Sequence, residues 1–94
     1  MGSKFNLGRL YLTRGVNDLV AENLKFAKCV SESIQKHAVG DWGNLEDEDK
    51  LANERALIDG SRLFSAYEGS GHPKIWIITE ADRAATTVLF PDEY

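Results

Sequence analysis

The chain has 94 residues, of which 43% are hydrophobic, and carries a formal net charge of −4. This size and composition suit a single globular domain over residues 1–94 and exclude a disordered chain, while the single cysteine excludes an internal disulfide and a cysteine metal cluster. No apolar run reaches the ~18 residues of a membrane-spanning helix, and the first residues lack the apolar stretch of a signal peptide, so we expect a cytoplasmic protein without a membrane partner. For residues 1–8, a disordered segment is kept as an alternative to an ordered one.

The first half of the chain is predicted to contain one strand and one long helix. Residues 9–16 alternate in character around a glycine, which predicts a short strand and a turn. Over residues 18–37 the apolar side chains recur with a period of 3.6, which predicts one amphipathic helix. Asn17 or Asp18 is expected to cap its start, and Gly40 to end the segment.

The cysteine and the two histidines are assigned structural roles. Cys29 lies in mid-helix, away from the apolar stripe, where a partly exposed and inert thiol is expected. His37 falls on the apolar side of the helix end and is expected to be packed there or favoured by the helix dipole. His72 precedes Pro73 in a glycine-rich loop, which argues against a preorganised site. With no second ligand or paired carboxylate in evidence, we expect no metal and no cofactor.

The second half is predicted to hold a loop, a helix and three strands. Residues 41–45 are predicted to form a loop, and Asn44 with Asp47 approximates a helix cap before a helix over residues 46–58. Asp59 and Gly60 are expected to end this helix. Strands rich in β-branched and aromatic side chains are expected over residues 62–67, 75–79 and 86–90, the second of them central in the sheet. The expected fold is therefore α+β, in the order β-α-α-β-β-β, with the first helix packed on one face of an antiparallel sheet of three or four strands.

A strongly acidic segment is the first candidate binding surface. Residues 41–54 hold six acidic side chains and one lysine, a local balance of −5: Asp41, Glu46, Asp47, Glu48, Asp49 and Glu54 against Lys50. Consecutive carboxylates on a helix point in different directions, so a solvated helix start is favoured over a divalent-cation site. Such a patch can still steer a basic partner. Trp42 in the same segment either covers the core or anchors a partner.

The turn of the last hairpin is the second candidate surface. Glu80, Asp82 and Arg83 lie between two strands, where polar residues are needed to form the turn. Besides this role in the turn, a second interpretation is that the same three side chains form a tip that recognises a partner. The chain has no basic stripe of the kind that binds phosphate backbones, so nucleic-acid binding is disfavoured.

Motifs along nearly the whole chain carry a resemblance to a known family. They are Thr13-Arg14-Gly15-Val16, Trp42-Gly43, Glu48-Asp49, Asn53, Ala56-Leu57, Gly60, Arg62-Leu63, Ser65-Ala66-Tyr67, the run from Ile75 to Arg83, Thr86-Thr87-Val88-Leu89, Pro91 and Glu93-Tyr94. Together they resemble a family of small proteins of bacterial plasmids and integrated mobile elements, labelled only "plasmid-related protein". The resemblance implies a mobile-element context and no particular activity.

The expected function is a non-enzymatic protein-binding domain, an accessory or host-defence-modulating factor of a mobile element. Its partner is expected to present a basic surface to Trp42, Glu46, Asp47, Glu48 and Asp49, and to the tip formed by Glu80, Asp82 and Arg83. Two alternatives stay open. One is a small toxin-like ribonuclease using Glu54, Arg62, Glu80 and Arg83, which the order of elements favours and the acidic charge disfavours. The other is a structural homodimer joined through a sheet edge.

Overall fold

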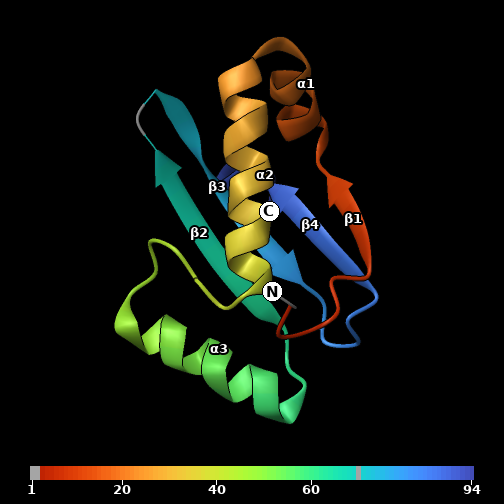
Figure 1. The fold of residues 1–94 in the computed structure, drawn as a ribbon, viewed down its shortest axis with the longest axis vertical. Coiled ribbons are helices and arrows are strands. Elements are labelled where there is room, and N and C mark those ends of the chain that lie inside the picture. Colours follow the sequence, from red (N-terminus) through yellow and green to blue (C-terminus); the bar gives the residue numbers. More distant parts are fainter. Residues whose placement is uncertain (1–2, 70) are drawn as a thin grey trace.

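Four strands form one mixed sheet in the order β1-β4-β3-β2 (Figure 1). In the computed structural model, which describes residues 3–69 and 71–94, they are β1 (Arg9–Leu12), β2 (Leu63–Gly69), β3 (His72–Thr79) and β4 (Ala85–Leu89). β2, β3 and β4 pair antiparallel, whereas β1 runs parallel to β4. The predicted α+β class is confirmed, but the wholly antiparallel sheet is wrong. β1 and β4 are far apart in the sequence, and no turn signal between them specifies the direction of their pairing.

Three α-helices, not two, accompany the sheet, so the order is β-α-α-α-β-β-β. They are α1 (Arg14–Glu22), α2 (Leu24–Ala38) and α3 (Asp47–Asp59), and a 3₁₀ turn, η1 (Pro91–Glu93), follows β4. The predicted single helix over residues 18–37 and the predicted turn before it are therefore wrong. The break falls at Asn23, whose backbone is extended and whose side chain accepts the N–H of Phe26 at 3.0 Å. Asparagine competes with the helical backbone in this way, so it ends one helix and caps the next.

The predicted cap at Asn17 or Asp18 is also wrong, because both residues lie inside α1. The start of α1 is instead capped by a carboxylate from the other end of the chain. Glu93 accepts the hydroxyl of Thr13 at 2.6 Å and the N–H of Gly15 at 3.0 Å. These hydrogen bonds, the one from Thr13 first among them, lower the pKa of Glu93.

Replacing Asn23 by alanine should lower the free energy of unfolding by about 1 kcal/mol, since the first turn of α2 loses its cap. Asn17 gives the matched control, because it is exposed within α1 and alanine favours a helix. Urea unfolding of both variants measures the difference. An N23A protein as stable as N17A would show that the Asn23 side chain does not define the helix break.

The helices α1 and α2 cover one face of the sheet (Figure 1). The main core lies between these two helices and the sheet. Its buried members come from every layer: Val16, Phe26, Val30, Tyr67, Ile75, Ile77 and Val88. β3 lies between β2 and β4, with Ile77 fully buried on one face and Ile78 only 6% exposed on the other. The prediction of a central strand buried on both faces is confirmed.

A chain of buried hydrogen bonds connects α2 to the sheet. The ring of the fully buried His37 contacts the Ser65 hydroxyl through Nδ1 and the Thr79 hydroxyl through Nε2, the latter at 2.9 Å. Thr79 contacts Thr86 at 2.7 Å, and Thr86 donates to the carbonyl of Leu7 at 2.7 Å.

Because a carbonyl only accepts, the direction of every hydrogen bond in this chain follows from the last one. Thr86 donates to Leu7, so Thr79 donates to Thr86, and the Nε2–H of His37 donates to Thr79. The Nδ1 atom of the neutral ring then accepts from Ser65. Burial, with a smaller contribution from Arg83, lowers the pKa of His37 to about 4 and keeps the ring neutral. The prediction of a packed histidine is confirmed.

The loop over residues 41–45 and α3 together seal the outer edge of β2. Asn53 of α3 hydrogen-bonds both the N–H and the C=O of Phe64. Further along the strand, the Asn44 N–H donates to the Ala66 carbonyl at 2.7 Å, and the Ala66 N–H donates to the Trp42 carbonyl. The outward-facing N–H and C=O groups of Phe64 and Ala66 are thus satisfied within the chain.

The N-terminal segment is attached to the core from residue 4 onward. The Lys4 N–H donates to the Ala38 carbonyl at 2.8 Å, and the Phe5 ring stacks on Trp42 with centroids 6.3 Å apart. Residues 1 and 2, part of the segment left open as disordered, lie outside the described residues. None of the described helices is long and apolar enough to cross a membrane.

Candidate functional site

Trp42 is buried, with 3% of its surface exposed. Its indole Nε1–H donates to Glu54 at 2.8 Å, and its ring packs against Phe5 and His37. It belongs to a second small core cluster with Ala56 and Leu63. Of the two roles predicted for Trp42, the buried position agrees with that of a side chain that covers the core.

The four consecutive acidic residues lie at the start of α3. Glu46 precedes the helix, and Asp47, Glu48 and Asp49 form its first turn, all of them exposed. Carboxylates at this end interact favourably with the helix dipole. Within residues 3–69 and 71–94, no group of three histidine, cysteine or acidic side chains could hold a metal ion.

The predicted helix cap at Asn44 is wrong. Its side chain faces β2 and accepts the N–H of Glu68 at 2.9 Å, so it is unavailable to the helix. The predicted end of the helix is confirmed, because Gly60 adopts φ of +82° at the C-cap of α3.

α3 is packed against the sheet edge on one side and exposes two large apolar side chains on the opposite side. Asn53 and Ala56 are buried against the sheet edge and Trp42. On the outside, Leu51 is 57% exposed and Ile58 88% exposed. Figure 1 shows α3 standing at one end of the sheet, apart from the two helices that cover its face. We call Asp47, Glu48, Leu51 and Ile58 the outer face of α3.

The hairpin tip is tied to the end of α3. Arg83 has φ of +59°, and its guanidinium donates to the carbonyls of Ala56 at 3.0 Å and Ser61 at 2.6 Å. Asp82 accepts the N–H of Ala84 within the turn, and Glu80 is exposed. Arg83 therefore completes the C-terminal end of α3 and holds the hairpin against it, while Glu80 and Asp82 remain on the surface.

The residues of the nuclease alternative are also bonded within the fold. Glu54 accepts the Trp42 indole N–H, and Arg62 donates to the Tyr94 hydroxyl at 3.0 Å. Arg83 makes the contacts described above. The structure thus gives a structural partner to three of the four side chains proposed for that chemistry.

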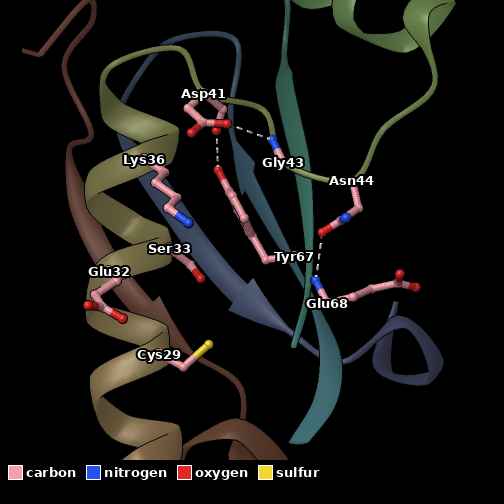
Figure 2. A pocket seen from close by; sticks show the side chains of 9 residues that line it. All are labelled: Cys29, Glu32, Ser33, Lys36, Asp41, Gly43, Asn44, Tyr67 and Glu68. Carbon is pink, nitrogen blue, oxygen red and sulfur yellow. Dashed lines mark hydrogen bonds between the residues drawn. The ribbon is translucent and has the colours of Figure 1, made fainter. Parts of the chain in front are cut away.

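A cleft of about 350 Å³ lies between α2, the loop over residues 41–45 and β2 (Figure 2). Cys29, Ser33 and Lys36 point into it from α2, and Tyr67 faces them from β2. The Tyr67 hydroxyl donates to the Asp41 carbonyl at 2.7 Å, and burial raises the pKa of this hydroxyl, so it stays a neutral donor.

Cys29 is paired with a histidine at the side of this cleft. Its Sγ lies 3.0 Å from Nε2 of His72, and Nδ1 of the same ring lies 3.0 Å from the Pro73 carbonyl. The imidazole packs edge-on against Phe26, with centroids 5.7 Å apart. His72 begins β3, so its predicted place in a connecting loop is wrong.

The prediction of a partly exposed Cys29 is confirmed, but the sequence did not indicate the pair. The two residues are 43 positions apart, and their meeting depends on how α2 crosses the sheet. The local signal is Gly69, because a Cβ atom there would collide with the His72 ring. A glycine at the end of a strand marks such a close approach only once its neighbour is known.

Compared with known proteins, the chain matches no protein-family model, no curated protein and no solved structure.

Proposed function

We propose that the protein is a cytoplasmic protein-binding domain, without an enzymatic activity of its own, that engages a partner through the outer face of α3. The observation that carries the proposal is the 88% exposure of Ile58, together with Leu51 at 57%, on a helix already packed through its other side. Exposed aliphatic side chains on one helix face are typical anchors for a groove in a partner.

The acidic residues at the Leu51 end of this surface support a partner of opposite sign there, whereas the exposed Arg55 lies between Leu51 and Ile58. The first turn of α3 is formed by Asp47, Glu48 and Asp49, and Glu46 precedes it. A surface of this kind is expected to attract a basic partner and to fix its orientation, while Leu51 and Ile58 supply the apolar contact. The resemblance to plasmid-related proteins supports an accessory or host-defence-modulating role in a bacterial mobile element.

Capture of a stoichiometric partner by the tagged protein should fall about tenfold when Ile58 is replaced by serine, because a central apolar anchor is lost. Leu24 gives the matched control, since it is 85% exposed on α2 and lies outside the proposed surface. Lysates of the native host, treated with nuclease, are compared for wild type, I58S and L24S by quantitative mass spectrometry. Charge reversal of Asp47 and Glu48 should weaken the same capture, while the lost interaction with the helix dipole lowers the stability of the fold only slightly.

Equal capture by I58S and L24S would reject the outer face of α3 as the binding surface. Capture that disappears entirely on nuclease treatment would reject the protein partner and favour the nucleic-acid alternative. Loss of capture in I58S alone, with unchanged circular dichroism, would support the proposal.

A further inference from the structure

We propose that the outer edge of β1 pairs antiparallel with β1 of a second copy of this chain, so that the two four-stranded sheets join into one. This edge lies across the sheet from β2, the strand that α3 contacts, and the pairing does not rest on the proposed function. Figure 1 shows β1 along the edge of the sheet, with β4 as its neighbour on the inner side.

The backbone of β1 has hydrogen-bonding groups that its own sheet leaves unused. In a parallel pair, the N–H and C=O groups of every second residue point toward the neighbouring strand. The N–H groups of Arg9 and Thr13 donate to the residue before β4 and to β4 itself, at 2.9 and 3.0 Å. Leu10 and Leu12 alternate with them, so their N–H and C=O groups point outward. Among the described residues, no hydrogen bond from a loop or a helix reaches these groups.

A two-fold axis at Tyr11 gives each of these groups a partner. An antiparallel ladder centred there sets Leu10 of one copy opposite Leu12 of the other, and residues opposite each other in such a pair exchange both N–H···O=C bonds. The axis forms this pair twice, since both copies contribute the same surface. The outward-facing N–H and C=O groups of both leucines are then bonded.

The side chains of β1 favour a second copy over an unrelated strand. Leu12 packs against the main core, and alternation places Leu10, which is about half exposed, on the same face of the sheet. The pairing sets Leu10 beside Leu12 of the second copy, so the two cores continue into each other. On the other face Tyr11, also about half exposed, meets Tyr11 of the second copy across the axis. Aliphatic and aromatic cross-strand pairs of this kind stabilise a sheet.

Charge complementarity supports the same register. Arg9 lies opposite Thr13 of the second copy, and the Thr13 hydroxyl donates to the carboxylate of Glu93 at 2.6 Å. This hydrogen bond lowers the pKa of Glu93, so the carboxylate is charged at neutral pH. Arg9 is exposed and forms no ion pair among the described residues, so its guanidinium is available to Glu93 of the second copy. Arg14, the other cation near this edge, begins α1 on the covered face of the sheet.

Cysteine cross-linking tests the register, in a Cys29→Ser background that removes the native thiol. Tyr11→Cys places two thiols opposite each other at the axis, with Cα atoms about 4.5 Å apart, a spacing that a disulfide can bridge. Mild oxidation should therefore link most Y11C chains into pairs. Arg9→Cys is the matched control, since Arg9 is equally exposed on the same strand but its two copies lie ~13 Å apart along the ladder.

Non-reducing electrophoresis reads the result. Absence of cross-linking in Y11C would overturn the pairing of β1 with itself. Cross-linking of R9C to the same extent as Y11C would overturn the register centred on Tyr11.

Sedimentation of the unmodified chain over a range of concentrations tests the pairing without cysteine variants. We expect a reversible dimer with a dissociation constant on the order of 10 µM, because an interface of this size is small. Arg9→Glu should raise this constant about tenfold, since two attractive pairs become repulsive. Lys28→Glu is the control, because it makes the same charge change at an exposed position of α2. A wild-type chain that stays monomeric at millimolar concentration would overturn the proposal, and equal constants for R9E and K28E would overturn the contact between Arg9 and Glu93.

Discussion

Replacing Gly43 by alanine is expected to lower the free energy of unfolding by about 3 kcal/mol or more. Gly43 adopts φ of +74°, and a Cβ atom there would overlap the backbone oxygen of Ala66 and come within 2.8 Å of the Tyr67 ring. Backbone strain at a positive φ and overlap with a fixed neighbour each cost on the order of 1–3 kcal/mol. Both act here in one place.

The loss should extend beyond the loop, because Gly43 faces β2. The neighbouring Asn44 N–H bonds the Ala66 carbonyl, which is the atom that the new Cβ would displace. Moving the loop away would expose the outer edge of β2 and unseat Trp42 from the core. An unpaired edge of this kind promotes aggregation, so G43A is also expected to precipitate on heating.

Gly60→Ala separates the two causes. Gly60 has φ of +82°, similar to Gly43, but a Cβ atom there meets nothing within 4 Å. Only the strain of the left-handed backbone remains, and we expect a loss of about 1 kcal/mol. The midpoints and slopes of urea unfolding give the comparison. Similar losses in G43A and G60A would mean that the contact with Ala66 contributes nothing.

Replacing His37 by leucine is expected to destabilise the protein by about 3 kcal/mol at pH 7. The leucine keeps the volume but leaves the buried hydroxyl of Ser65 and the hydroxyl of Thr79 without their partner. Each unsatisfied buried polar group costs on the order of 1–3 kcal/mol. Urea unfolding at pH 7 measures this loss, and a loss below that of N23A would contradict the assignment of a connected network.

The same histidine should make the stability of the wild-type protein fall as the pH is lowered from 6.5 toward 4. The folded state holds the pKa of His37 at about 4, below the usual 6.5, because the ring is buried. The unfolded chain therefore takes up the proton first, and protons favour unfolding across this window. The stabilisation is complete above about pH 6.5, and up to about 3 kcal/mol of it is lost as the pH reaches 4.

His37→Leu should remove this slope between pH 5 and 6.5, a range above the ordinary pKa values of carboxyl groups. His72→Gln is the control and should retain it, because only the other histidine is changed. Unfolding free energies measured at half-unit intervals of pH decide between them. A pH dependence that survives in H37L but disappears in H72Q would show that His72, and not His37, causes the effect.

The parts of the fold predicted from sequence are those that local pattern determines. The run from Ile75 to Thr79, apolar on both sides, indicated a strand in the middle of the sheet, and β3 is there. Gly60 indicated the end of α3 because a left-handed residue at that position favours glycine. In each case the residues that decide the structure are neighbours in sequence.

The parts that were missed depend on partners far away in the sequence. Nothing near Thr13 shows that Glu93 will cap α1, and nothing near Cys29 shows that His72 will face it. Asn23 is different, since an asparagine within an apolar period of 3.6 is a local signal for a break. The apolar stripe nevertheless continues on either side of Asn23 and favours a single helix. A stripe of this kind also continues when two consecutive helices pack on the same face of a sheet.

The two edges of the sheet differ in what they can accept. β1 forms the other edge. The Arg9 N–H donates to Ala84, just before β4, and the Thr13 N–H donates to Val88 of β4, so the N–H groups of Leu10 and Leu12 point outward. Leu10 is 48% exposed and Tyr11 is 49% exposed. Among the described residues, Phe64 and Ala66 of the β2 edge are bonded by Asn53 and the loop over residues 41–45, so a strand from another molecule would add beside β1. If two copies met through their β1 edges, the joined sheet would hold two copies rather than extend into a fibre, because the described part of each β2 edge is already bonded.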